Sequence, residues 1–208
     1  MDRHHDAHHP EPDEQLADRL AISSDIRPIV WRTAPPQQPG CLSHEVARLL
    51  LNEHTQAGDI VVDVDDDTAF AATAAATGRR HHALGGDTHM ATLGHAAGYI
   101  DLILLHWPRT AINPHWLLRA CRTLLRGAGH LVIAVTVDPA HRVAQLSALG
   151  GAADTVGLRT VRHVAAVAPQ AATPTGRDRA ATSPPRTAEP PLSPHTDLLI
   201  FRPDGHDD

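Results

Sequence analysis

The chain has 208 residues, a length that suits one domain with a buried core plus tails. Aromatic residues make up only 3% of it, so the interior must be built mainly from Ala, Val, Leu and Ile. The net charge is −6 and the acids concentrate at the two ends, which leaves no broad basic field for a nucleic-acid backbone.

The two cysteines, Cys41 and Cys121, are too few and too far apart for a disulfide framework or a four-ligand zinc site. A reduced, cytoplasmic setting fits this usage. The longest apolar run, at 131–137, is far shorter than the roughly 20 residues that span a bilayer, and the His-rich N-terminus is unlike a signal peptide. We therefore expect a cytoplasmic protein with no membrane segment.

Residues 1–40 combine paired histidines, scattered acids and a Pro-rich stretch, which predicts a flexible leader with room for one short helix or strand at 16–31. From residue 41 a regular alternation begins. Ser43 is a suitable N-cap for a helix that ends at the 56–58 turn, and the apolar run in 59–63 predicts a strand buried on both faces.

The alternation continues to residue 167. The predicted helices share a cap, a terminal glycine or an apolar face, and lie at 69–77, 88–98, 113–127 and 138–149. The predicted strands share a compact apolar run, and lie at 81–84, 101–105, 130–137 and 161–167. Together with the first pair they form an α/β core over 41–167.

Residues 168–195 contain seven prolines, which predicts a disordered Pro-rich insertion. A final core strand follows over 196–203, paired with 161–167 as an antiparallel hairpin at the sheet edge, and 204–208 form an acidic tail. The predicted fold class is α/β, a doubly wound Rossmann-like sheet that is mostly parallel and ends in this hairpin.

In a doubly wound sheet, ligands bind at the carboxyl ends of strands, where the strand order reverses. Asp63 and Asp65 lie there after one predicted strand, and Asp87 closes the next, at a spacing suited to gripping ribose hydroxyls. These three carboxylates are candidate cofactor contacts. An acidic, solvated surface loop is the alternative interpretation.

Several segments, taken as an ordered set, resemble the cofactor half of class I S-adenosylmethionine-dependent DNA amino-methyltransferases, the N4-cytosine and N6-adenine enzymes. The segments are 43–50, 55–63, 78–80 followed by the strand ending in Asp87, 101–109 and 124–132, and the likeness resumes at 195–203. The resemblance implies a methyltransferase sheet, S-adenosylmethionine as cofactor and nucleic acid as partner. It also places a degenerate catalytic motif at His106, Pro108 and Arg109.

The chain departs from that family in its chemistry-bearing loops. The family follows its first Asp with a Gly-x-Gly-type loop, whereas no glycine lies between Gly58 and Gly78 here. His106 replaces the amine-orienting Asp, Asn or Ser of the family. Too few residues separate Asp87 from Asp101 for the family's next helix and strand, so we expect the third strand to be missing. A methyltransferase-like pseudoenzyme with weakened or lost catalysis is the leading hypothesis.

Three other functions remain open. One is active S-adenosylmethionine-dependent N-methylation of nucleic acid, and another is non-catalytic binding of a protein partner that the sequence does not name. The third is a Mg²⁺-dependent phosphatase, because Asp63, Asp65 and Asp67 resemble the Asp-x-Asp-x-Thr loop of haloacid-dehalogenase-type enzymes. The N-terminal histidines lack the fixed geometry of a metal site, and we predict none.

Overall fold

A computed structural model describes residues 17, 27–86, 93–109, 112–169 and 192–205. Seven strands form one sheet in the order β1-β6-β7-β5-β4-β2-β3. Only β7 runs antiparallel to its neighbours, β5 and β6. The predicted fold class, a mostly parallel Rossmann-like sheet with a C-terminal antiparallel hairpin, is confirmed.

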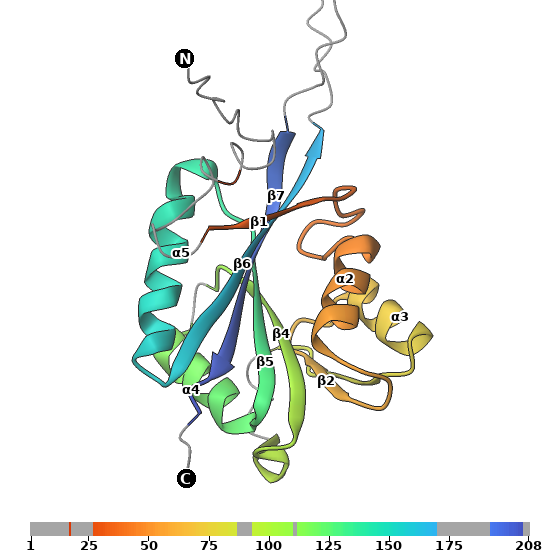
Figure 1. Cartoon of the computed structure of the whole chain (residues 1–208), viewed down its shortest axis with the longest axis vertical. Coiled ribbons are helices and arrows are strands. Elements are labelled where there is room, and N and C mark those ends of the chain that lie inside the picture. Colours follow the sequence, from red (N-terminus) through yellow and green to blue (C-terminus); the bar gives the residue numbers. More distant parts are fainter. Residues whose placement is uncertain (1–16, 18–26, 87–92, 110–111, 170–191, 206–208) are drawn as a thin grey trace, which may run out of the picture.

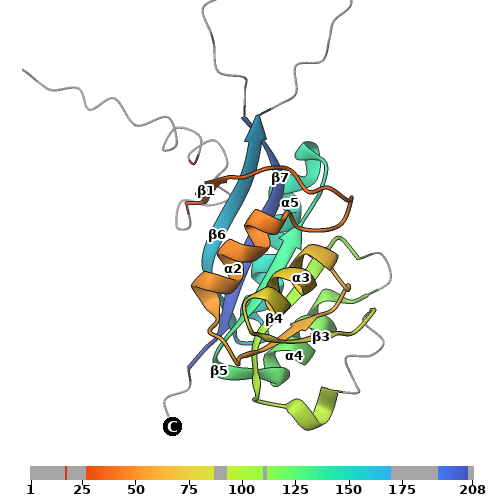
Figure 2. The same ribbon diagram turned by 90° about the vertical axis from the view of Figure 1, so that its right-hand side faces the viewer.

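Strands and helices alternate along the chain from β1 to β6, except that β4 is the next described element after β3. The strands are β1 (Ile29–Arg32), β2 (Ile60–Asp63), β3 (Arg80–Ala83), β4 (Ile100–Trp107), β5 (Leu125–Val135), β6 (Leu158–Pro169) and β7 (Leu192–Pro203). The helices are α2 (His44–His54), α3 (Thr68–Ala76), α4 (Pro114–Leu124) and α5 (Pro139–Asp154). Figures 1 and 2 show α2 and α3 on one face of the sheet and α4 and α5 on the other.

Each face of the sheet buries its own apolar core, because the side chains of a strand alternate between the two faces. Leu102 and Leu104 of β4 pack with Val46 and Leu50 of α2, whereas their neighbour Ile103 belongs to the core beneath α4 and α5. The expected two-sided burial of the 59–63 strand is confirmed, since Val61 and Val62 are at most 1% exposed. Among the described residues, no helix has the length and apolar character needed to cross a membrane.

Three predicted N-caps and the terminal Gly78 are confirmed, whereas Gly127 does not end α4, which stops at Leu124, and lies in β5 instead. Ser43, Asn113 and Asp138 each accept a hydrogen bond from a backbone N–H in the first turn of the helix that follows, and Gly78 takes a positive φ of 72° just after α3. The strand boundaries fit less well. β5 begins at Leu125 rather than 130, because Leu125 already pairs with Ile100 across a register shift.

Two expectations about the sheet edges had different outcomes. The hairpin of β6 and β7 is present, but it does not form the edge: β1 pairs with β6, from Ile29 opposite Val164 to Arg32 opposite Val167. That strand lies inside the segment expected to be a leader. At the other edge lies β3, and the described residues between β3 and β4 contain no strand, as the missing third strand predicts.

Gly129 allows β4 and β5 to approach each other closely where their register shifts. A Cβ at this position would lie 2.8 Å from the carbonyl oxygen of Ile100 and 3.1 Å from that of Arg126, whereas a Cβ at Gly127 would meet nothing within 4 Å. Backbone atoms cannot move aside as a side chain can. Position 129 therefore has no room for a methyl group.

We predict that Gly129→Ala lowers the free energy of unfolding by about 1–3 kcal/mol, the usual cost of overpacking. The matched variant Gly127→Ala should stay within about 0.5 kcal/mol of the parent chain. Urea unfolding followed by circular dichroism measures both. Equal stability of the two variants would contradict the close approach of the strands.

Candidate functional site

The turn between β2 and α3 is built on the carboxylate of Asp63, which is fully buried at the end of β2. One oxygen accepts the backbone N–H of Asp65 at 3.0 Å and the other accepts that of Asp67 at 2.5 Å. Between them Asp66 takes a positive φ of 61°, a conformation that Asp tolerates better than most residues. The backbone N–H groups of Asp65 and Asp67 are therefore bonded within the turn itself.

Asp67 caps α3 and joins it to two other segments. Its Oδ1 accepts the backbone N–H groups of Ala69 and Phe70 at 2.9 and 3.0 Å. Its Oδ2 accepts the backbone N–H of Leu42 at 2.5 Å and lies 3.0 Å from Nε2 of His106. The carboxylate is 1% exposed, so these contacts take the place of water.

Asp65 completes the link between this turn and the end of β4. Its Oδ2 accepts the backbone N–H of His106 at 2.7 Å, and its Oδ1 pairs with the guanidinium of Arg109. The Nε of Arg109 donates to the carbonyl of His106 at 3.1 Å. The two predicted half-sites, at 63–67 and 106–109, are therefore bonded directly to each other.

The acids of the turn have opposite pKa shifts. Burial raises the pKa of Asp63 above its ordinary value, and the negative charge of Asp67 adds to this rise. Burial also acts to raise the pKa of Asp67, but the hydrogen bonds from His106, Leu42 and Phe70 outweigh it and leave the pKa lowered. Asp67 is thus held ionised, and the His106 imidazole is the donor in their contact.

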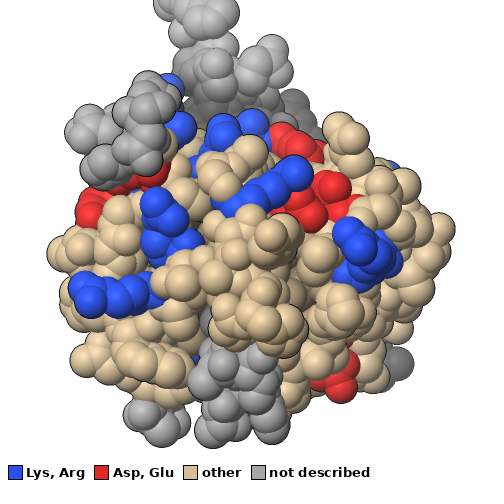
Figure 3. All heavy atoms as spheres, turned by 90° about the horizontal axis from the view of Figure 1, so that it is seen from below, with Lys and Arg blue, Asp and Glu red and all other residues tan. Residues whose placement is uncertain are grey.

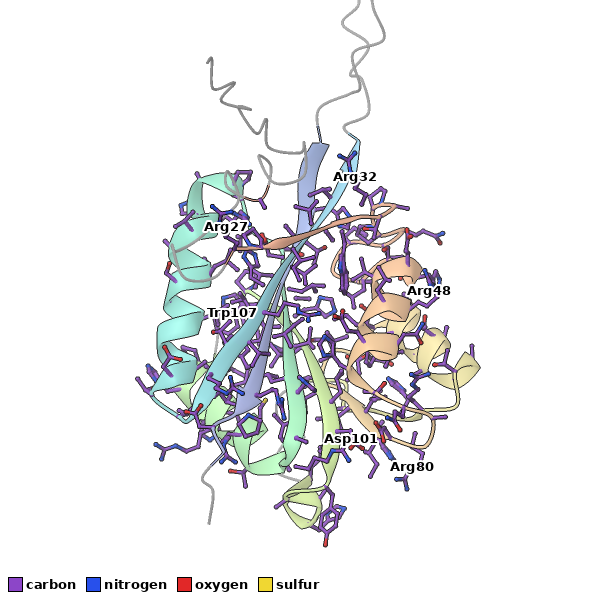
Figure 4. All side chains as sticks on the ribbon, in the orientation of Figure 1. Arg27, Arg32, Arg48, Arg80, Asp101 and Trp107 are labelled. Carbon is purple, nitrogen blue, oxygen red and sulfur yellow. The ribbon has the colours of Figure 1, made fainter. Side chains whose placement is uncertain are left out.

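The structure brings together five of the residues singled out from the sequence: Asp63, Asp65, Asp67, His106 and Arg109. Pro108 lies between the last two and follows a cis peptide bond with Trp107. Trp107 lies on the α5 side of the sheet (Figure 4), where its indole N–H donates to Gln145 at 3.0 Å. Asp87, the expected ribose contact, lies outside the described residues.

A second polar cluster lies at the same edge of the sheet, under α5, and sequence reasoning missed it. Asp197 of β7 accepts two hydrogen bonds from the guanidinium of Arg142, at 2.6 and 2.5 Å, and lies 2.8 Å from Nε2 of His163. All three residues are at most 7% exposed. The sequence offered one signal for this cluster: Asp197 precedes the apolar run of one strand, and His163 lies inside another strand.

No protein-family model and no curated protein matches this sequence. The similar solved structures include a geranyl diphosphate methyltransferase in complex with GPP and sinefungin, at 15% identity and a TM-score of 0.43, covering 60% of this chain and 62% of that one. The chain thus spans less than two thirds of that protein's length.

Two other similar structures are also methyltransferases. One is geranyl diphosphate C-methyltransferase from Streptomyces coelicolor A3(2) with Mg²⁺, geranyl diphosphate and S-adenosyl-L-homocysteine, at 13% identity and a TM-score of 0.47, covering 78% of this chain and 79% of that one. The other is the antibiotic-resistance methyltransferase Kmr, at 16% identity and a TM-score of 0.43, covering 76% of this chain and 93% of that one.

Asp67 provides a test of the turn through stability and its pH dependence. We predict that Asp67→Ala lowers the free energy of unfolding by about 2–4 kcal/mol at pH 7, because it removes an N-cap and leaves buried donors without an acceptor. Asp67→Asn keeps a good cap and should cost less. Urea unfolding of both variants and the parent measures these differences.

The pH dependence follows from the lowered pKa of folded Asp67. A carboxyl group whose pKa is lower in the folded state stabilises it above the unfolded pKa, near 3.8, and loses this effect as the pH falls. The stability difference between the parent and Asp67→Asn should therefore be constant above about pH 5 and shrink below it. A difference that grows on acidification would contradict the assigned contacts.

In the cluster under α5, we expect the loss of one negative charge to destabilise the fold more than the Asp67 variants do. Asp197→Asn should lower the free energy of unfolding by about 3–5 kcal/mol, because it leaves the Arg142 guanidinium buried without its counter-charge. The control is Asp204→Asn, since Asp204 faces Arg159 at 3.9 Å with both side chains about half exposed. We expect that control to change stability by less than about 1 kcal/mol in the same unfolding experiment.

Proposed function

We propose that this chain is a methyltransferase-like protein that has lost methyl transfer and acts by binding. The observation that carries the proposal is the bonding between residues 63–67 and 106–109. The relation to the DNA amino-methyltransferases in particular rests on the sequence motifs, and S-adenosylmethionine is the ligand that this relation implies. The contacts of the described residues support a site that is closed to it.

The first support is the use of backbone donors in the turn after β2. In Rossmann-like folds this turn binds the ligand through backbone N–H groups at the start of the following helix. Here the N–H groups of Asp65 and Asp67 are bonded to Asp63, and those of Ala69 and Phe70 are bonded to Asp67. These four donors are not available to an incoming carboxylate or hydroxyl.

The second support is electrostatic. A methionine carboxylate at this turn would lie beside Asp63, Asp65 and Asp67, and like charges about 4–6 Å apart in a partly buried place repel strongly. Arg109 is the cation nearest at hand, but Asp65 already pairs with it. To contact Arg109, the cofactor carboxylate would have to break that pair, so the new ion pair would only replace the one that is lost.

The third support comes from the acceptor side. In the family that the sequence resembles, the residue at the place of His106 orients the acceptor amine. The His106 imidazole instead donates to Asp67, and the Arg109 guanidinium turns back to Asp65 and to the carbonyl of His106. Both side chains are thus engaged with the cofactor turn, where a methyl group would have to pass.

The same contacts weigh on the alternatives. Active N-methylation of nucleic acid requires the bonds between the two half-sites to open. A Mg²⁺-dependent phosphatase requires free carboxylate oxygens, but those of Asp63, Asp65 and Asp67 accept hydrogen bonds. Among the described residues, no group of three or more His, Cys, Asp or Glu side chains is arranged to hold a metal ion. Non-catalytic binding needs none of these changes.

Calorimetric titration with S-adenosylmethionine tests this proposal on the full chain. We expect no saturable heat up to roughly millimolar ligand, since four backbone donors of the turn and the Arg109 guanidinium are already bonded within the chain. The variant Asp65→Ala removes the carboxylate that pairs with Arg109 and accepts the N–H of His106, so any residual affinity should be higher in it than in the parent.

Two results would overturn the proposal. Micromolar binding of S-adenosylmethionine by the parent chain would restore the enzyme hypothesis, and methyl transfer to DNA from labelled cofactor would establish it. Mg²⁺-dependent release of phosphate from a phosphomonoester would select the phosphatase. The variant Asp66→Gly serves as the matched control, because it changes the same turn but removes none of the hydrogen bonds described above.

A further inference from the structure

A cavity of about 280 Å³ lies toward the amino end of the sheet, far from the turn after β2, on the face covered by α2. It is open to solvent and is lined by the last turn of α2 and by strands β5, β6 and β7. The residues that line it are Glu53, His54, His130, Val161, Arg162 and Arg202. Figure 3 views the molecule from this end; the chain has no lysine, so every blue group there is an arginine.

Three nitrogen atoms of this lining are buried without a hydrogen-bond partner among the described residues. They are Nε2 of His54, Nδ1 of His130 and Nε of Arg202. The two imidazole rings lie side by side, with centroids 4.6 Å apart. Buried polar atoms are nearly always paired in folded proteins. The Nε of Arg202 can only donate, and each neutral imidazole can place its one N–H on the unpaired nitrogen, so the three together fit a ligand that supplies acceptors.

The charges around the cavity decide the sign of that ligand. Arg162 is paired with Glu53, and the guanidinium of Arg202 adds a positive charge to the lining. Burial lowers the pKa of His130 to about 4, and the charges of His54, Arg202 and Arg126 add to this effect. The surroundings therefore disfavour a further cation and favour an anion.

A divalent metal fits these residues poorly. Only two imidazoles face the cavity, the carboxylate of Glu53 is paired with Arg162, and a metal would add positive charge beside Arg202. An oxyanion fits these residues better, because it adds negative charge beside Arg202 and accepts hydrogen bonds. A guanidinium fork matches two oxygens of a phosphate group, and a neutral imidazole has one N–H to donate.

We propose that this cavity binds a phosphate-type oxyanion, with Arg202, His54 and His130 donating to its oxygens. The site lies away from residues 63–67 and 106–109, which gather where β2 and β4 end. It is thus independent of the function proposed above, and no reaction is assigned to it. A free phosphate and the phosphate group of a small metabolite share this chemistry.

Calorimetric titration of the full chain with inorganic phosphate at pH 7 tests the site. We expect saturable binding with a Kd on the order of 1 mM or tighter, competition by sulfate, and no binding of chloride at equal ionic strength. Glycerol 3-phosphate, titrated in parallel, separates the two sources: tighter binding than inorganic phosphate assigns the site to a metabolite.

Arg202→Gln should weaken phosphate binding at least about tenfold, because it removes the charge and the fork together. His130→Gln should weaken it less. Arg159→Gln is the matched control: Arg159 lies on β6 opposite Arg202 of β7, but its side chain is 58% exposed and it does not line the cavity. It should bind phosphate as the parent does.

Circular dichroism and thermal unfolding establish that each variant is folded. If Arg202→Gln does not fold, Arg202→Lys keeps the charge, loses the fork, and should still bind more weakly than the parent. The proposal is overturned if the parent shows no saturable phosphate binding. It is equally overturned if the Arg202 variants bind as the parent does, or if Arg159→Gln weakens binding as much as they do.

Discussion

The carboxylate of Asp67 is the contact on which the carboxyl edge of this sheet depends. Its two oxygens receive four hydrogen bonds, from the segment before α2, from the first turn of α3 and from the end of β4. A carboxylate is saturated by about this number of donors. One buried side chain therefore fixes three segments that a Rossmann-like fold usually leaves open for a ligand, and the site cannot open without breaking several of these bonds.

The two ends of the sheet contrast in how their polar groups are satisfied. At the carboxyl edge the acids find partners within the chain, both around Asp67 and around Asp197, which neutralises Arg142 and receives His163. Toward the amino end, buried nitrogens of His54, His130 and Arg202 line one cavity and have no hydrogen-bond partner among the described residues. The acids at the edge that the fold class makes chemically privileged are thus internally paired, although Nδ1 of His163 there has no hydrogen-bond partner among the described residues. At the other end, three such nitrogens line one cavity.

The sequence predicted most elements because their signals are local: a cap such as Ser43, a terminal Gly78, or the buried run of β2. It also predicted which residues meet at the site, since strand ends share an edge. It did not predict that β1 pairs with β6, because the apolar run of β1 has only three residues and is too short to distinguish from a loop. This strand removes the expected edge from the hairpin. It also missed the Arg142, His163 and Asp197 cluster, because these partners are 34 and 55 residues apart and no spacing rule relates them.

The absence of glycine from the turn after β2 has a physical explanation in the same contacts. A tight strand-to-helix turn needs one residue with positive φ, and Asp66 supplies it at 61° where glycine would do so at less cost. The bonding of the donors comes from other residues: the N–H groups of Asp65 and Asp67 are bonded to Asp63, and those of Ala69 and Phe70 are bonded to Asp67. Asp66 thus gives the turn its shape, while Asp63 and Asp67 occupy the donors that a ligand would otherwise use.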